Sequence, residues 1–117
     1  QSAPALLNAF GALLADWMEQ SGFRDGCPMA TTILETVPQS PALTQAAGEG
    51  LAAWRTIFEQ RLRADGATAA DSLRLANLTI AVLEGSLIQA RVAQDRRPII
   101  ESLEEVAALM QMRSGRT

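Results

Sequence analysis

The chain has 117 residues, a formal net charge of -3 and hydrophobic residues at 48% of its positions. This length corresponds to one domain, so residues 1–117 are expected to fold as a single unit. Histidine is absent and every basic residue is arginine, which excludes histidine-dependent triads and the usual zinc sites. Neither a basic stripe nor a glycine-rich phosphate loop is present. We therefore expect no catalytic residues, no metal, no cofactor and no nucleic-acid contact by this chain.

Helix-forming residues dominate, and no stretch alternates polar and apolar residues with a period of two. These properties predict an all-α fold. The single cysteine has no partner for an internal disulfide, no signal peptide with a basic start is visible, and the uncharged run 75–83 is too short to cross a bilayer. The composition favours a soluble, cytoplasmic protein.

The first predicted helix runs from Ala3 to Ser21. Ser2 is placed to cap its free amides, and Gly22 follows where a left-handed residue ends a helix. Apolar residues recur at helical spacing in two adjoining rows, namely Leu6, Phe10, Leu13 and Trp17 in one and Leu7, Leu14 and Met18 in the other. This pattern is typical of an amphipathic helix.

Two further helices are predicted before the middle of the chain. A short one, from Pro28 to Thr36, carries Met29 and Ile33. A long one follows from Pro41 to Ala64, with Ser40 as its cap and proline in its first turn. Its apolar face consists of Leu43, Ala47, Leu51, Trp54, Phe58 and Leu62.

The predicted central helix, from Thr68 to Asp95, is apolar on nearly every side and so demands burial from several directions. One stripe consists of Leu73, Ala76, Ile80, Leu83, Leu87 and Ala90. The opposite side needs a second chain as its cover, and the last helix, Pro98 to Met112, offers a narrow apolar seam beside it. The predicted homodimer interface is therefore Leu75, Val82, Gly85, Ser86, Gln89, Ile99, Leu103, Val106 and Met110.

The aromatic residues of the first and third helices allow two interpretations, an ordinary core or the walls of a ligand cavity. Asn77, Glu84 and Arg91 are seven residues apart on the central helix and form a polar line along the edge of its apolar stripe. Asn77 and Glu84 are thus available as the few polar groups of a cavity. Glu84 either pairs with Arg91 or an arginine of a facing helix, or contacts a ligand directly. On the cavity interpretation, a mostly apolar small molecule contacts Phe10, Trp17, Met29, Ile33, Trp54, Phe58, Asn77 and Glu84.

Three stretches, GCPMATTILET, LAAWRTIFEQRLRADG and LANLTIAVLEGSLIQARVAQD, followed by a last amphipathic helix, carry a family resemblance. In this order and spacing the chain resembles the C-terminal regulatory domain of TetR-family transcriptional repressors, closest to the LmrA/YxaF-like branch. Its most recognisable parts are Gly26-Cys27-Pro28, Trp54-Arg55 and Leu83-Glu84-Gly85. The resemblance implies a bundle of about five antiparallel helices that dimerises and holds an inducer, while a separate N-terminal helix-turn-helix domain, missing from this chain, binds operator DNA.

These observations together predict an effector-sensing, homodimeric domain of a transcriptional repressor with a small hydrophobic or aromatic effector. Two other classes remain open. A helical adaptor would bind another protein through the same apolar faces, and a small helical enzyme would need a catalytic group that the sequence does not display.

Overall fold

The computed structural model describes residues 1–24 and 39–114. Within these ranges the chain forms four helices and no strand, which confirms the all-α class. The predicted short helix from Pro28 to Thr36 lies outside the described residues. The four helices are α1 (Ala3–Gln20), α3 (Pro41–Ala64), α4 (Ala69–Ala93) and α5 (Arg97–Arg113).

Three of the helices begin at the hydroxyl residues expected from the sequence. Ser2, Ser40 and Thr68 have extended backbones, and each side-chain oxygen accepts a hydrogen bond from the amide three residues further on, at 3.3, 3.3 and 3.0 Å. These bonds satisfy amides that the helix itself leaves without a partner. At the other end of α1, Gly22 has φ +67°, as predicted for the residue that stops this helix.

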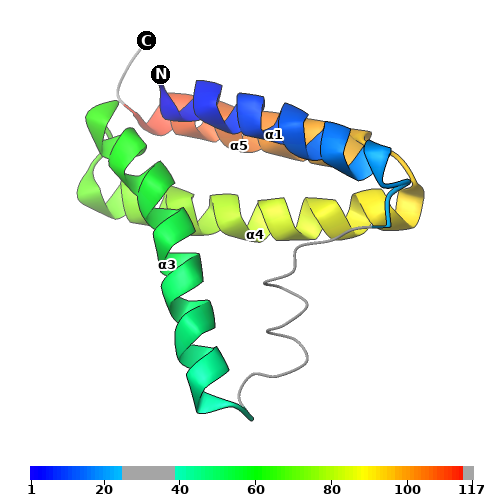
Figure 1. Cartoon of the computed structure of the whole chain (residues 1–117). Helices are drawn as coiled ribbons and strands as arrows, with labels where there is room; N and C mark the ends of the chain where they lie inside the picture. Colours follow the sequence, from blue (N-terminus) through cyan, green and yellow to red (C-terminus); the bar gives the residue numbers. More distant parts are fainter. Residues whose placement is uncertain (25–38, 115–117) are drawn as a thin grey trace.

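Three helices lie along one another and the fourth crosses them (Figure 1). Helices α1 and α4 run in the same direction, and α5 runs back antiparallel to both and packs against both. Helix α3 packs on α4 but crosses it, and it has little direct contact with α1. The described part of the chain is thus a three-helix layer with one crossing helix, and not a bundle in which every neighbour is antiparallel.

Helix α5 is covered on two sides within its own subunit. The expected interface residues Ile99, Leu103 and Met110 are at most 1% exposed, so the subunit itself already covers them. They are enclosed because α1 approaches very closely. A Cβ atom added at Gly11 would lie 2.9 Å from Cδ1 of Leu103, so glycine makes this contact possible.

The buried stripe of α4 is rotated relative to the predicted one. Leu73 is 45% exposed, whereas Leu75 and Ser86, expected at a dimer interface, are buried inside the subunit. The rotation is possible because two of the buried hydroxyls on this helix bond to their own backbone, although the buried Ser72 Oγ has no hydrogen-bond partner among the described residues. Thr79 Oγ1 donates to the carbonyl of Leu75 at 2.8 Å and Ser86 Oγ donates to that of Leu83 at 3.0 Å. The stripe consists of Ser72, Leu75, Ala76, Thr79, Leu83, Ser86, Leu87 and Ala90.

None of the four described helices is both long enough and apolar enough to cross a membrane.

Candidate functional site

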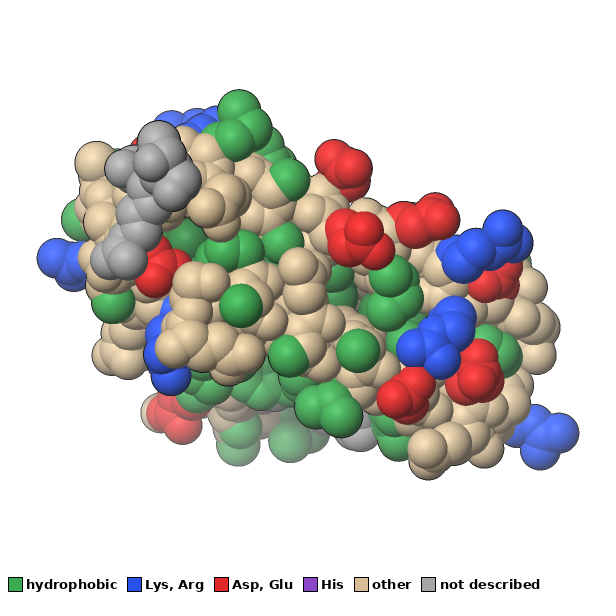
Figure 2. All heavy atoms as spheres, turned by 90° about the horizontal axis from the view of Figure 1, so that it is seen from above, with side chains coloured by type: hydrophobic (Ala, Val, Ile, Leu, Met, Phe, Trp, Pro, Cys, Tyr) green, Lys and Arg blue, Asp and Glu red, His purple; other side chains and the backbone are tan. Residues whose placement is uncertain are grey.

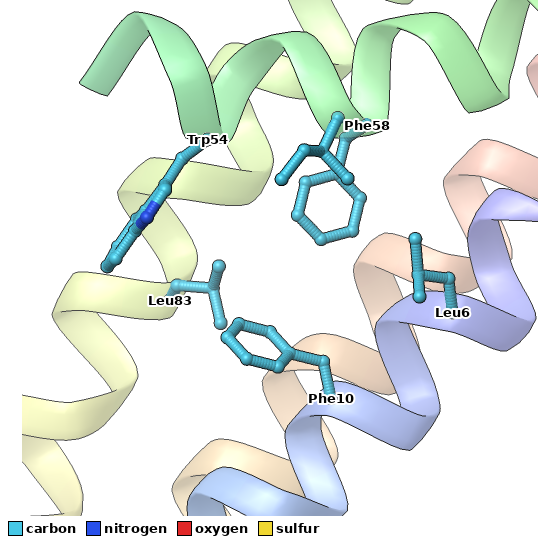
Figure 3. A pocket seen from close by; sticks show the side chains of 6 residues that line it. Leu6, Phe10, Trp54, Phe58 and Leu83 are labelled. Carbon is cyan, nitrogen blue, oxygen red and sulfur yellow. The ribbon is translucent and has the colours of Figure 1, made fainter. Parts of the chain in front are cut away.

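An apolar cavity of about 320 Å³ is lined by side chains of α1, α3 and α4. Three helices supply its walls (Figure 3). In this view Phe10 of α1, Phe58 of α3 and Leu83 of α4 point toward one another across the space. The lining residues are Leu6, Phe10, Trp54, Ile57, Phe58 and Leu83.

Helical spacing places these side chains together. Leu6 and Phe10 are four residues apart, and Ile57 and Phe58 follow Trp54 by three and four residues, so each set lies on one helix face. Leu83 belongs to the buried stripe of α4 and is 1% exposed. The side chains that line the cavity are therefore all hydrocarbon, except for the indole N–H of Trp54.

Three of the aromatic residues predicted to bind a ligand do line this cavity, namely Phe10, Trp54 and Phe58. The fourth aromatic residue of that prediction, Trp17, is not among the lining residues. Trp17 is 38% exposed and lies almost two turns beyond Phe10 on α1. The predicted contacts Met29 and Ile33 lie outside the described residues.

The two polar residues predicted to orient a ligand are not in the cavity wall. Asn77 is exposed, and its Oδ1 accepts a hydrogen bond from Nη1 of Arg55 at 3.4 Å. Glu84 is half-buried beside the lining residue Leu83. Arg91, its expected partner, is exposed, and no ion pair joins it to Glu84 within residues 39–114.

Sequence reasoning did not name three of the lining residues as ligand contacts, Leu6, Ile57 and Leu83. Leu6 precedes Phe10 by one turn and Ile57 follows Trp54 by three residues, so helical spacing around the chosen aromatics would have found both. Leu83 was assigned to the core stripe of the central helix. Leu83 belongs to the core and also lines the cavity, because the cavity lies against α4 between the side chains of α1 and α3.

The ionic contacts of the described residues lie away from the cavity, at the ends of the helices. Arg96 Nη1 is 3.0 Å from Asp16 Oδ1 and 3.7 Å from Glu19 Oε2, which ties the turn before α5 to the end of α1. Figure 2 shows acidic and basic side chains intermixed at this end of the molecule. In the same turn, the hydrogen bond from the Arg97 side chain lowers the pKa of the Asp95 carboxyl, and this bond also raises the pKa of Arg97.

A groove with a volume of about 500 Å³ lies between the outward faces of α4 and α5. Five predicted interface residues line this α4–α5 groove, namely Val82, Gly85, Ser86, Gln89 and Val106. A Cβ atom built on Gly85 would meet no atom of residues 1–24 and 39–114 within 4 Å, so these residues do not require glycine there. The remaining lining residues are Leu78, Ala81, Ser102, Glu105 and Leu109. Residues 1–24 and 39–114 contain no cluster of three potential metal ligands.

The comparison with family models decides what kind of domain carries these two features. Residues 4–105 match the model of the LmrA/YxaF-like transcriptional regulator, C-terminal domain. The chain belongs to this family. It is thus a TetR-family C-terminal domain of a transcriptional regulator.

Two curated relatives agree with this assignment. Each is an uncharacterized HTH-type transcriptional regulator of Mycobacterium tuberculosis, one from strain CDC 1551 / Oshkosh and one from strain ATCC 25618 / H37Rv. Each is 30% identical over 102 residues, a match that covers 80% of this chain and 52% of the relative. The chain therefore spans about half the length of these relatives. No solved structure matches it.

Because Leu6 lines the cavity and Leu7 is buried in the core, enlargement of these neighbouring leucines is expected to change stability by different amounts. Leu6→Phe extends into the cavity and is expected to change the free energy of unfolding by less than about 1 kcal/mol. Leu7→Phe places the same extra volume in the close-packed core, where Leu7 is 0% exposed, and is expected to cost about 1–3 kcal/mol. Urea unfolding measures both, and equal losses would mean that no space adjoins Leu6.

Proposed function

We propose that this chain is the effector-sensing and dimerisation domain of a TetR-like transcriptional repressor. The observation that carries the proposal is the apolar cavity between α1, α3 and α4, found in a domain of a transcriptional-regulator family. On this proposal the chain has no catalytic role, and operator DNA is bound by a part of the regulator outside these 117 residues. Occupation of the cavity then relieves repression.

The chemistry of the cavity wall defines the class of inducer. Burying a charge against leucine, isoleucine and phenylalanine without a partner is strongly unfavourable, so the buried part of the inducer is uncharged. A volume of about 320 Å³ admits a small molecule with up to three aromatic rings or a short acyl chain. The indole N–H of Trp54 supplies one hydrogen-bond donor. The expected inducer is aromatic or lipid-like with one or two polar atoms.

A neutral fluorescent probe, N-phenyl-1-naphthylamine, tests the binding part of the proposal. Its emission is expected to rise when it binds the unmodified protein. Leu6→Trp fills the cavity and should weaken binding at least about tenfold, which is about 1.4 kcal/mol. Leu13→Trp, the same change at a 67% exposed position of the same helix, is the matched control. Equal affinities for the two variants would place the probe elsewhere and remove the support for this site.

The α4–α5 groove supports the dimerisation part of the proposal. Beside it, α4 exposes large apolar side chains, with Leu78 38%, Ile88 61% and Val92 83% exposed. Exposed apolar surface of this kind is characteristic of a protein interface. Open space at Gly85 lets a helix from a second copy approach closely, and two such helices from each copy form a four-helix interface. The contacts come from the outward faces of α4 and α5, and not from the enclosed Leu103 side.

Two arginine substitutions at helical glycines separate dimerisation from folding. At both Gly85 and Gly48 an added Cβ atom meets no atom of the described residues within 4 Å, so both variants are expected to keep the subunit fold. Gly85→Arg is expected to weaken the dimer at least about 100-fold, since it places bulk and charge where a second helix packs. Gly48→Arg, on α3, should remain dimeric. Sedimentation equilibrium measures both; a Gly85→Arg dimer of unchanged affinity would rule out this face, and a monomeric unmodified protein would favour the adaptor function.

A further inference from the structure

The last turn of α3 holds the first turn of α1. The backbone amide of Ala3 donates a hydrogen bond to Oδ2 of Asp65 at 2.8 Å, and both residues are buried, at 0% and 8% exposed. Alongside, Nη1 of Arg61 donates to the carbonyl of Gln1 at 3.0 Å. A carboxylate is favourable at this place because the N-terminal amides of a helix carry a partial positive charge. These two contacts join the helices that otherwise touch little.

The C-terminal end of α3 is also fixed by its own chain. Gly66 has φ +103°, a left-handed backbone that ends the helix. The amide of Ala67 then returns to the carbonyl of Leu62 at 3.0 Å, and Leu62 is 0% exposed. Helix α4 begins immediately afterwards, at Ala69. Asp65 therefore sits in a short elbow that is joined to α1, α3 and α4 together.

The opposite end of α3 has no comparable anchorage among the described residues. Every position from 41 to 46 is exposed, and the buried residues of this helix are Phe58 and Leu62, both near its C-terminal end. The helix has 24 residues, a length of about 36 Å. The cavity-lining residues Trp54 and Phe58 lie about 10 to 17 Å from Asp65 along the axis. A small rotation at the elbow therefore changes the separation between α3 and α1 at the cavity.

We propose that α3 is a lever hinged at Asp65, and that its rotation about the Asp65–Ala3 contact sets the width of the apolar cavity. This inference rests on the proposed function of that cavity as an inducer site and adds how the site opens. An inducer that moves α3 away from α1 strains the Asp65–Ala3 contact. Removal of this contact therefore changes the free energy of opening the cavity and, with it, the affinity for the inducer.

A comparison of two capping residues tests the lever. Both variants are made in a Trp17→Phe background, so that Trp54 is the remaining tryptophan of the two in the chain. Asp65→Ala and Ser2→Ala each remove one side-chain acceptor from the first turn of α1, but only Asp65 connects that turn to α3. Asp65→Ala is expected to raise the acrylamide quenching constant of Trp54 about twofold or more. It should also change the affinity for N-phenyl-1-naphthylamine about fivefold or more, whereas Ser2→Ala should change neither.

Circular dichroism establishes that each variant is folded before quenching is compared. If Asp65→Ala does not fold, Arg61→Ala, which removes only the exposed contact to Gln1, takes its place with a smaller expected rise in quenching. Equal quenching in the hinge variant and in Ser2→Ala overturns the lever, whether or not the probe binds. Failure of the unmodified protein to bind the probe counts instead against the proposed function, and the quenching comparison still decides the lever.

Discussion

The crossing of α3 over α4, while α1 and α5 stay aligned with α4, is the constraint on which the rest of the structure depends (Figure 1). Aligned helices stay near each other over a long stretch, and α1 and α5 approach closely at Gly11 and Leu103. A crossing helix meets its neighbours over a short length and then diverges. Around the crossing, aromatic and aliphatic side chains from three helices surround a space without filling it. The cavity is thus a consequence of the angle of α3, and the Asp65–Ala3 hydrogen bond joins the C-terminal end of this helix to α1.

The packing of α1, α5 and α4 into one layer also explains the α4–α5 groove. Since α5 turns its apolar stripe toward α1 and α4, its outward face is left with a mixture of small, polar and aliphatic residues beside the exposed apolar side chains of α4. A glycine with open space around it, Gly85, lies in the same groove. One face of α4 therefore supports the core and another remains available to a second copy. The cavity and this outward groove are separated by the helix itself, so a ligand and a partner would not compete for the same side chains.

Local signals in the sequence predicted the helices well and their contacts less well. Caps such as Ser2 and Thr68 act within a few residues, so they located the helix starts without any tertiary information. The phase of α4 was missed because Thr79 and Ser86 are polar by composition yet satisfied by their own helix when buried. Hydrophobic periodicity counts such residues as outward-facing.

In the candidate site, too, the sequence predicted the helix faces but not which residues of a face meet another helix. Phe10 and Trp17 share one row of α1, and nothing in that row tells which of them meets α3. Only the position of the crossing decides it, and the crossing depends on contacts such as Asp65 with Ala3, 62 residues apart in sequence. Likewise Leu103 was assigned to a dimer seam because its spacing fits one, whereas the close approach at Gly11 encloses it within the subunit.

The central claim is that the space between α1, α3 and α4 is an open apolar cavity in the folded chain. Xenon binds such cavities without directional contacts, so a crystal structure of the protein under xenon pressure tests the claim most directly. The account predicts xenon density enclosed by Leu6, Phe10, Phe58 and Leu83. Phe10 and Trp54 packed against each other across that space, with no xenon between them, would contradict it.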